Sequence, residues 1–351
     1  MADTKAPVFV VVSALDAGHI TLLDNLFVTD ADPEERTTVP SLSFLIQHSS
    51  PSPARDSGVT NLIFDLGVKR DLNRYTPEQQ VHVAQRQPII TDPDCAASLR
   101  TGCSIRSTEK VGEDAALLDP EKDIDVVILS HVHWDHIGTP SDFSGATFAV
   151  GSGTLDLLRH GAGPLYPAEL FNDDELPALR TIEFPPVFSR GGDGDEYYTA
   201  PRVPKHTPVP QDTCARLPTS AEVWSWQPLA GFPHALDFFG DGSLFVIDSP
   251  GHLYGHVNLL ARTGENTYIY LGGDCCHNPK ILSGEKEIAL YDDGRGGLRS
   301  VHVDTRMARK TIDRIGKNVR EMRKGAEVEV ILAHDKEWRE LNRHRFWPGK
   351  L

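Results

Sequence analysis

The segment His131–His136, with the sequence His-Val-His-Trp-Asp-His, restricts the possible folds of this chain more than any other feature. It follows the apolar run Val126–Leu129, which predicts a buried strand that ends at Ser130. Three histidines and an aspartate crowded at a strand end would desolvate and repel one another without a cation. Neutral imidazoles and carboxylates are ligands for zinc, iron or manganese, so the pattern predicts a metal site.

The composition is that of an ordinary soluble globular protein. Hydrophobic residues make up 39% and charged residues 24% of the 351 residues, enough for one large domain or two. Fifty acidic against 35 basic residues give a formal net charge of −15. Such a field repels phosphate backbones, so we expect no nucleic-acid partner.

The cysteines and the first residues bear on the cellular compartment. The run Val8–Val12 is too short for an export signal or a membrane span, so we expect no membrane partner. The five cysteines are scattered, odd in number and without a Cys-x-x-Cys pair. We therefore expect reduced thiols in a cytoplasmic protein.

Short apolar runs along the chain predict many strands and few helices. The expected strands are 8–12, 42–46, 61–67, 126–129, 148–150, 244–247, 257–260, 268–271 and 328–332. Residues 154–160 and 305–324 predict helices, the second of them with one apolar face and one basic face.

Residues 185–235 differ from the rest of the chain because they are rich in proline and glycine, which argues against regular elements. The segment also holds Trp224 and Trp226. A long insertion of this kind forms either a lid or pocket wall over a site, or a loop that fills a satellite core, and the sequence favours the two equally.

Three later segments supply further metal-ligand side chains, each at the end of an apolar run. They are Pro250-Gly251-His252-Leu253-Tyr254-Gly255-His256, Gly272-Gly273-Asp274 and the strand-end His334. Ligands at strand ends are held by a rigid sheet, while the adjoining turns leave room for a substrate.

In this order, the motifs resemble those of the metallo-β-lactamase superfamily, over the chain from about Val8 to His334. The resemblance implies an α+β fold, an αββα sandwich of two mixed β-sheets flanked by helices. It implies a single domain over residues 1–351, with the segment 185–235 as an insertion and candidate lid.

Carried over residue by residue, the resemblance implies two divalent metal ions, zinc before manganese or iron. His131, His133 and His256 would bind one ion, Asp135, His136 and His334 the other, and Asp274 would bridge both. His252 would orient a loop or a ligand, and Asp65 would support the site through hydrogen bonds.

The resemblance also implies a hydrolase that opens a lactone or a cyclic amide or carbamate through a hydroxide shared by the two ions. Asp135 would steer the nucleophile or pass a proton to the leaving group. Quorum-quenching lactonases carry a tyrosine three residues after the bridging aspartate, where this chain has His277. An imidazole there could donate a hydrogen bond or a proton, so His277 is the second catalytic candidate. The expected partner is a small molecule, such as an aromatic lactam or lactone.

Two alternatives share this fold. A thioesterase similar to glyoxalase II would need basic C-terminal residues for glutathione; Arg339, Arg343, Arg345 and Lys350 lie there beside Glu337 and Glu340. An oxidoreductase similar to persulfide dioxygenases would use one iron ion and would not need the second ligand set.

Overall fold

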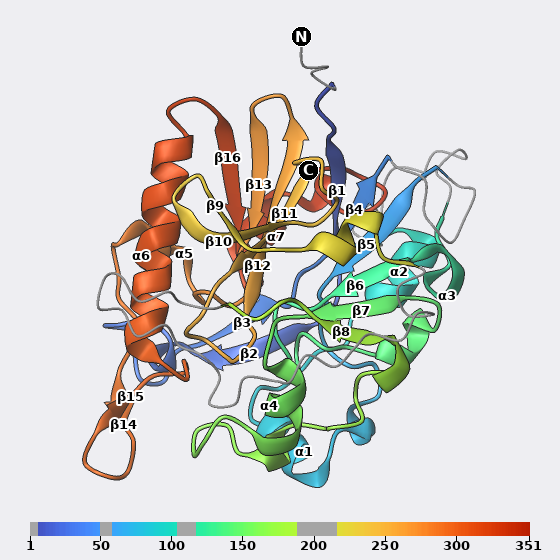
Figure 1. Cartoon of the computed structure of the whole chain (residues 1–351). Helices are drawn as coiled ribbons and strands as arrows, with labels where there is room; N and C mark the ends of the chain where they lie inside the picture. The colour runs from blue at the N-terminus through green and yellow to red at the C-terminus, as the bar shows by residue number, and fades with distance from the viewer. Residues whose placement is uncertain (1–5, 50–57, 104–116, 188–215) are drawn as a thin grey trace.

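The computed structural model describes residues 6–49, 58–103, 117–187 and 216–351, and within them two six-stranded sheets lie face to face (Figure 1). In spatial order, the first sheet contains β1 (Val10–Leu15), β4 (Ser43–His48), β5 (Thr60–Phe64), β6 (Val126–Ile128), β7 (Thr147–Val150) and β8 (Thr181–Glu183). The second contains β16 (Glu327–Ile331), β13 (Thr267–Leu271), β12 (Val257–Gly264), β11 (Leu244–Asp248), β10 (Phe232–Asp237) and β9 (Gln227–Leu229).

Both sheets are mixed. The neighbours from β5 to β8 are parallel in the first sheet, whereas β1, β4 and β5 are antiparallel. In the second sheet only β13 and β16 are parallel. The predicted sandwich of two mixed sheets is confirmed.

The main core lies between the sheets. Successive side chains of a strand point to opposite faces, and all five residues of β5 are buried. Leu62 and Phe64 pack in the core between the sheets, and Ile63 packs in the outer core of the first sheet. Burial on both faces explains why the strands read as continuous apolar runs.

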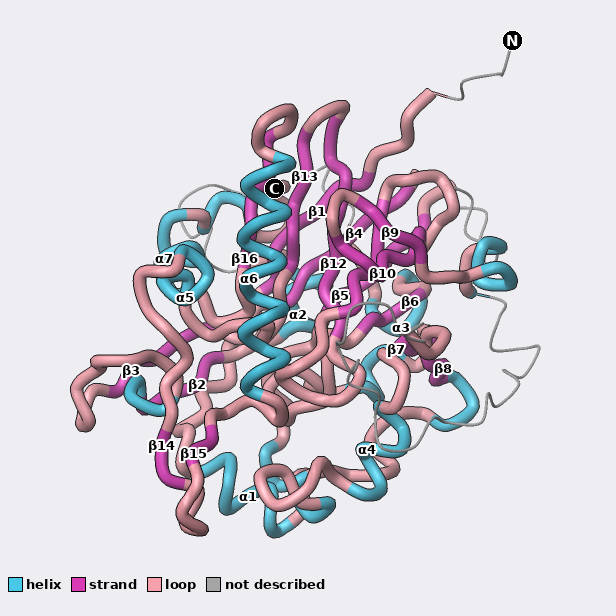
Figure 2. The backbone as a smooth tube through the Cα atoms, turned by 60° about the vertical axis from the view of Figure 1, so that its left-hand side comes forward, coloured by secondary structure: helices cyan, strands magenta, loops and turns pink. Residues whose placement is uncertain are grey.

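Helices cover the outer faces of both sheets (Figure 2). On the first sheet they are α2 (Cys95–Thr101) and α4 (Thr154–His160), and on the second sheet α5 (Pro279–Ser283) and α6 (Thr305–Met322). The other helices are α1 (Pro77–Ala84), which contributes Val83 to a separate small core, α3 (Pro120–Asp123), and α7 (Lys336–Leu341), which contributes Trp338 to the core between the sheets. Helix α6 begins where the Asp304 side chain accepts a hydrogen bond from the Met307 amide. None of the helices in the described ranges combines the length and the apolar composition that a membrane-spanning segment needs.

Two hairpins lie outside the sandwich: β2 (His19–Leu23) with β3 (Arg36–Pro40), and β14 (Tyr291–Asp292) with β15 (Leu298–Arg299) (Figure 1). Neither hairpin was predicted. The expectation of no regular structure in residues 185–235 is wrong for its described end, which contains β9 and the start of β10. The middle of that segment, 188–215, lies outside the described residues, so its role as a lid stays a prediction.

Candidate metal centre

The segments with metal-ligand side chains meet because their strands end at the same edge of the sandwich. In the second sheet, β13 and β16 are parallel and pair Leu271 with Ile331. Asp274 and His334 each lie three residues beyond that pair, so the two side chains are adjacent. The loop after β6 lies at the same edge. The amide of Val257, the first residue of β12, donates to the Ser130 carbonyl of this loop at 2.8 Å.

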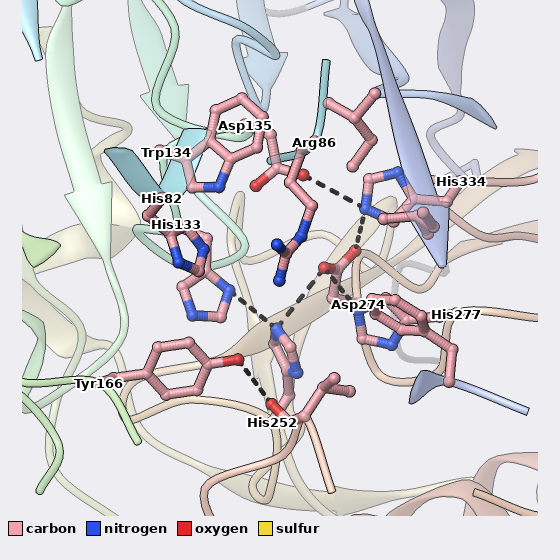
Figure 3. Close-up of a pocket in the computed structure, with 14 residues that line it drawn as sticks. His82, Arg86, His133, Trp134, Asp135, Tyr166, His252, Asp274, His277 and His334 are labelled. Atoms are coloured by element: carbon pink, nitrogen blue, oxygen red, sulfur yellow. Dashed lines mark hydrogen bonds and ion pairs between the residues drawn. The ribbon is translucent and has the colours of Figure 1, made fainter. Parts of the chain in front are cut away.

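One group of donor atoms contains three imidazole nitrogens. His133 Nδ1 lies 2.9 Å from His131 Nε2 and 3.0 Å from His252 Nε2. Asp274 Oδ2 lies 3.5 Å from His252 Nε2 (Figure 3). The same oxygen lies 3.8 Å from His131 Nε2. All four ligand atoms lie within 4.8 Å of one another, a spacing at which one cation could contact them all.

The second group lies on the other side of the same aspartate. Asp274 Oδ1 is 3.2 Å from both His136 Nε2 and His334 Nε2. Asp135 Oδ2 is 3.5 Å from His334 Nε2 and 4.0 Å from His136 Nε2. Asp274 thus directs one carboxylate oxygen to each group.

Asp65 holds ligand side chains of both groups in place. Its oxygens accept from the Ser130 amide at 2.6 Å, from the Ser130 hydroxyl at 2.7 Å and from His136 Nδ1 at 2.9 Å. The Ser130 hydroxyl oxygen in turn lies 3.0 Å from His131 Nδ1. Because these Nδ1 atoms are occupied as donors, the Nε2 atoms of His131 and His136 face the centre. The proposed supporting role of Asp65 agrees with these contacts.

His334 is oriented in the same way from the opposite side. Its Nδ1 donates to the Pro40 carbonyl at the end of β3, at 2.7 Å, which leaves Nε2 for the centre. The hairpin that the sequence did not predict is therefore part of the support of the site.

The donor set fits cations. His136 Nε2 and Asp274 Oδ1 are buried and have no hydrogen-bond partner in the described structure, an arrangement that is costly unless an ion fills the gap. Burial and the neighbouring imidazoles hold the pKa of His131 and of His252 well below the ordinary value, which keeps both rings neutral as metal ligands must be.

The carboxylates give the second group a preference for positive charge. Burial lowers the pKa of His136, yet Asp274, Asp65 and Asp135 outweigh it and raise that pKa well above the ordinary value. Burial likewise opposes ionisation of Asp274, but His334, His136 and His277 hold its pKa well below the usual range. A divalent cation at this position would meet the same demand.

The structure differs from the prediction at one pair of histidines. His252, not His256, lies among the donor atoms of His131, His133 and Asp274. His256 Nε2 instead accepts a hydrogen bond from the Asp274 amide at 3.2 Å, so His256 lies behind the backbone of Asp274. The physical reason is the turn between β11 and β12, in which Gly251 has a φ of +128° that favours glycine and directs the next residue, His252, into the centre.

The two catalytic candidates both line the pocket at the centre. His277 Nε2 lies 3.2 Å from Asp274 Oδ2, and its ring packs against Phe27 at 4.8 Å between ring centroids. Asp135 lines the same pocket.

Sequence reasoning missed four residues near this centre. One is His302, whose Nδ1 atom lies 3.1 Å from the Nδ1 atom of His252. The others are Arg86, His82 and Tyr166 of the pocket wall. No ligand spacing in the sequence marked these four.

Trp224 and Trp226 do not line this pocket. Both rings pack near Phe184 at the end of β8, and their Nε1 atoms donate to the Phe238 and Pro185 carbonyls. Their described positions place both rings at the edge of the core between the sheets rather than over the site. Cys275 and Cys276, beside Asp274, are buried and form no disulfide within the described residues.

Comparison with known families assigns the chain to a superfamily. The model of the metallo-beta-lactamase superfamily matches residues 101–318, which is more than half of the chain. The chain therefore belongs to the metallo-β-lactamase superfamily.

Curated relatives are fungal. The chain is 30% identical over 348 residues to the cytochrome P450 monooxygenase mpaDE of Penicillium roqueforti, a match of 92% of this chain and 33% of that protein. It is 29% identical over 223 residues to the gamma-lactamase MBL2 of Gibberella moniliformis, which covers 62% of this chain and 71% of that protein. The chain spans about a third of the length of the first curated relatives that it matches.

Solved structures agree on the fold. A quorum-quenching N-acyl homoserine lactone hydrolase superposes with a TM-score of 0.57 at 15% identity, and the match covers 99% of this chain and all of the other. At this identity the likeness concerns the fold alone.

Proposed function

We propose that the chain is a dinuclear metal-dependent hydrolase that opens a lactone or a cyclic amide or carbamate. The observation that carries the proposal is the pair of donor groups that share Asp274. In this assignment His131, His133 and His252 would hold one ion, Asp135, His136 and His334 would hold the other, and Asp274 would contribute to both. The ions are divalent, with zinc first because imidazole and carboxylate donors suit it.

The ions, when bound, would polarise a carbonyl oxygen and supply hydroxide near neutral pH. The protein side chains have separate tasks. Asp65 and Pro40 fix the imidazole tautomers, so the ligand nitrogens need no rearrangement on binding. Asp135 lines the pocket and can transfer a proton to the oxygen or nitrogen that leaves as the ring opens. His277 is placed to donate a hydrogen bond to the carbonyl oxygen as it gains negative charge.

The choice of a cyclic ester or amide rests on the gamma-lactamases among the relatives, together with the site.

Two observations disfavour a glutathione thioesterase: Arg339 pairs with Asp16 at 2.8 Å, and Arg345 pairs with Glu329 at 2.6 Å. Two of the four basic residues near the C-terminus are therefore already engaged in ion pairs. The complete second donor group argues against a mononuclear iron oxygenase.

The test is a hydrolysis screen of metal-replete protein against lactones, lactams, cyclic carbamates and thioesters, with metal content measured by mass spectrometry. We expect two zinc or manganese ions per chain and ring opening of at least one cyclic substrate. One iron per chain, with oxygen uptake in the presence of a persulfide, would overturn the proposal.

A further inference from the structure

Arg86 lies in the wall of the metal-centre pocket, opposite the ligand side chains. It follows α1, and its carbonyl accepts from the Thr21 amide of β2 at 2.6 Å, which fixes the backbone. Its guanidinium points toward the space between His133, Asp135 and Asp274 (Figure 3). No other lysine or arginine is among the described residues that line this pocket.

The Arg86 guanidinium has no carboxylate partner among the residues that the structure describes. Within the described parts of the chain it forms no ion pair, and its one side-chain hydrogen bond is a long one, 3.3 Å from Nη1 to the Gln85 side-chain oxygen. The two acids of the pocket wall, Asp135 and Asp274, are both assigned above to metal ions. A half-buried arginine without an acidic partner is thus left facing the substrate space.

The positive charge of Arg86 reaches its neighbours in the wall. Burial and this charge lower the pKa of His82 to about 4, so His82 is neutral at physiological pH. The Tyr166 hydroxyl donates to the Val301 carbonyl at 2.7 Å, and burial raises the pKa of this hydroxyl, so Tyr166 is a neutral group in the wall. The wall on this side consists of one cation among neutral groups, which suits an anionic group of a substrate.

The cavity next to the metal-centre pocket has a more apolar wall. A cavity of about 270 Å³ adjoins the metal-centre pocket, and both are lined by Leu22, Phe27, His277 and His334. Leu22, Phe27, Val28 and Val39 form an apolar wall in that cavity, with charged residues of α7 at its rim. The scissile bond would then lie between the Arg86 side of the metal-centre pocket, which accepts an anion, and the larger adjoining cavity, which has an apolar wall.

We propose that Arg86 binds a carboxylate on the substrate, so that the preferred substrate is a lactone or lactam carrying an acid group on its ring system. This inference rests on the proposed hydrolase function and narrows its substrate class. A carboxylate fits the guanidinium because both are planar and form two parallel hydrogen bonds. The pair also offsets the repulsion that a chain of net charge −15 exerts on an anion.

The test compares two phthalides of matched size, one with a ring carboxylate and one with the corresponding carboxamide. For metal-replete wild-type protein, we expect the ratio of kcat/KM, carboxylate over carboxamide, to exceed one. In Arg86→Met this ratio should fall by about 10- to 100-fold, the range for a lost charged hydrogen bond. Arg86→Lys should retain part of the preference. Arg74→Met, at an exposed arginine outside the pocket, is the matched control and should leave the ratio unchanged.

Binding provides a readout independent of turnover. Calorimetry with the two corresponding cyclic ethers, which cannot be hydrolysed and so gain no new carboxylate, should show the same loss of carboxylate preference in Arg86→Met, with metal content equal to that of the wild type. If the wild type opens no ring but the binding preference depends on Arg86, the hydrolase proposal fails and the anion subsite stands. If turnover occurs and Arg86→Met keeps the wild-type ratio in both assays, the Arg86 proposal is overturned.

Discussion

Asp65 shows how one residue that is not a proposed ligand can set the geometry of the centre. Its carboxylate binds Ser130 twice and His136 once. In Asp65→Asn one oxygen becomes an amide nitrogen, which cannot accept from His136 or Ser130. We expect metal affinity to fall by about 10- to 100-fold, measured by competition with a chromogenic chelator. Asp71→Asn, an exposed helix cap, should leave affinity unchanged; an equal loss there would show that the effect is not specific.

The histidine pair provides a direct test of the metal assignment. His252→Ala should remove one ion and lower kcat/KM by at least about 100-fold, whereas His256→Ala should retain both ions. His256→Ala should still unfold more easily, by about 1–3 kcal/mol, because the Asp274 amide loses its acceptor. Metal analysis and urea unfolding of both variants separate the two roles. The opposite pattern of metal loss would restore His256 as the ligand.

His277 differs from the ligands in its expected effect. His277→Ala should lower the rate of ring opening while both ions are retained, since the residue is proposed to act on the substrate oxygen. Kinetics and metal analysis on the same preparation check this. Loss of an ion would instead make His277 a ligand, a role that its 3.2 Å distance to Asp274 Oδ2 permits.

Cys103 predicts a dependence of stability on pH far from the metal centre. Burial raises the pKa of its thiol to about 11, from an ordinary value near 9. Between these values the unfolded chain loses the proton while the folded chain keeps it, so the free energy of unfolding falls as pH rises from 9 to 11. The slope is about 1.4 kcal/mol per pH unit at most. Urea unfolding of Cys103→Ala should show a correspondingly weaker dependence than the wild type, and identical slopes would contradict the assignment.

At the scale of single elements, α6 stabilises the second sheet through its apolar face. Ile315 is 1% exposed and belongs to the outer core of the second sheet, which also contains residues of β12 and β13. Ile315→Ala should lower the free energy of unfolding by about 2–5 kcal/mol, through lost transfer energy and a cavity. Lys317→Ala, on the exposed face of the same helix, should change it by less than about 0.5 kcal/mol. Chemical denaturation of the two variants measures the difference, and equal values would refute this account of α6.

The parallel pairing of β13 with β16 acts at the same scale, because it places Asp274 and His334 at equal distances beyond the sheet. Gly273 makes the turn possible: its φ is +48°, and a Cβ there would lie 2.9 Å from the Ser130 Cβ. Strand pairing and this close approach together bring the bridging aspartate against the loop after β6.

At the scale of the whole molecule, the metal centre joins the ends of strands from both sheets, so bound ions should stabilise the entire sandwich. At a free ion concentration 1,000 times the Kd, binding contributes about 4 kcal/mol. A strong chelator should therefore lower the Tm of wild-type protein in a thermal melt. Asp274→Ala, which lacks the bridging ligand, should respond to the chelator far less. A wild-type Tm that is insensitive to the chelator would argue against ions at this edge.

The sequence by itself determined the kinds of donor, their order and the strand ends that carry them, because buried strands and ligand motifs are local patterns. The resemblance of these motifs to the metallo-β-lactamase superfamily then implied the sandwich and a site that includes Asp135, His136, Asp274 and His334. Local patterns could not decide between His252 and His256, which a single turn separates, since the backbone direction at Gly251 determines which ring enters the centre. Arg86 and the β2–β3 hairpin reach the site only through contacts between distant segments, such as Thr21 with Arg86 and Pro40 with His334. Such contacts depend on packing in three dimensions, so only the tertiary structure decided them.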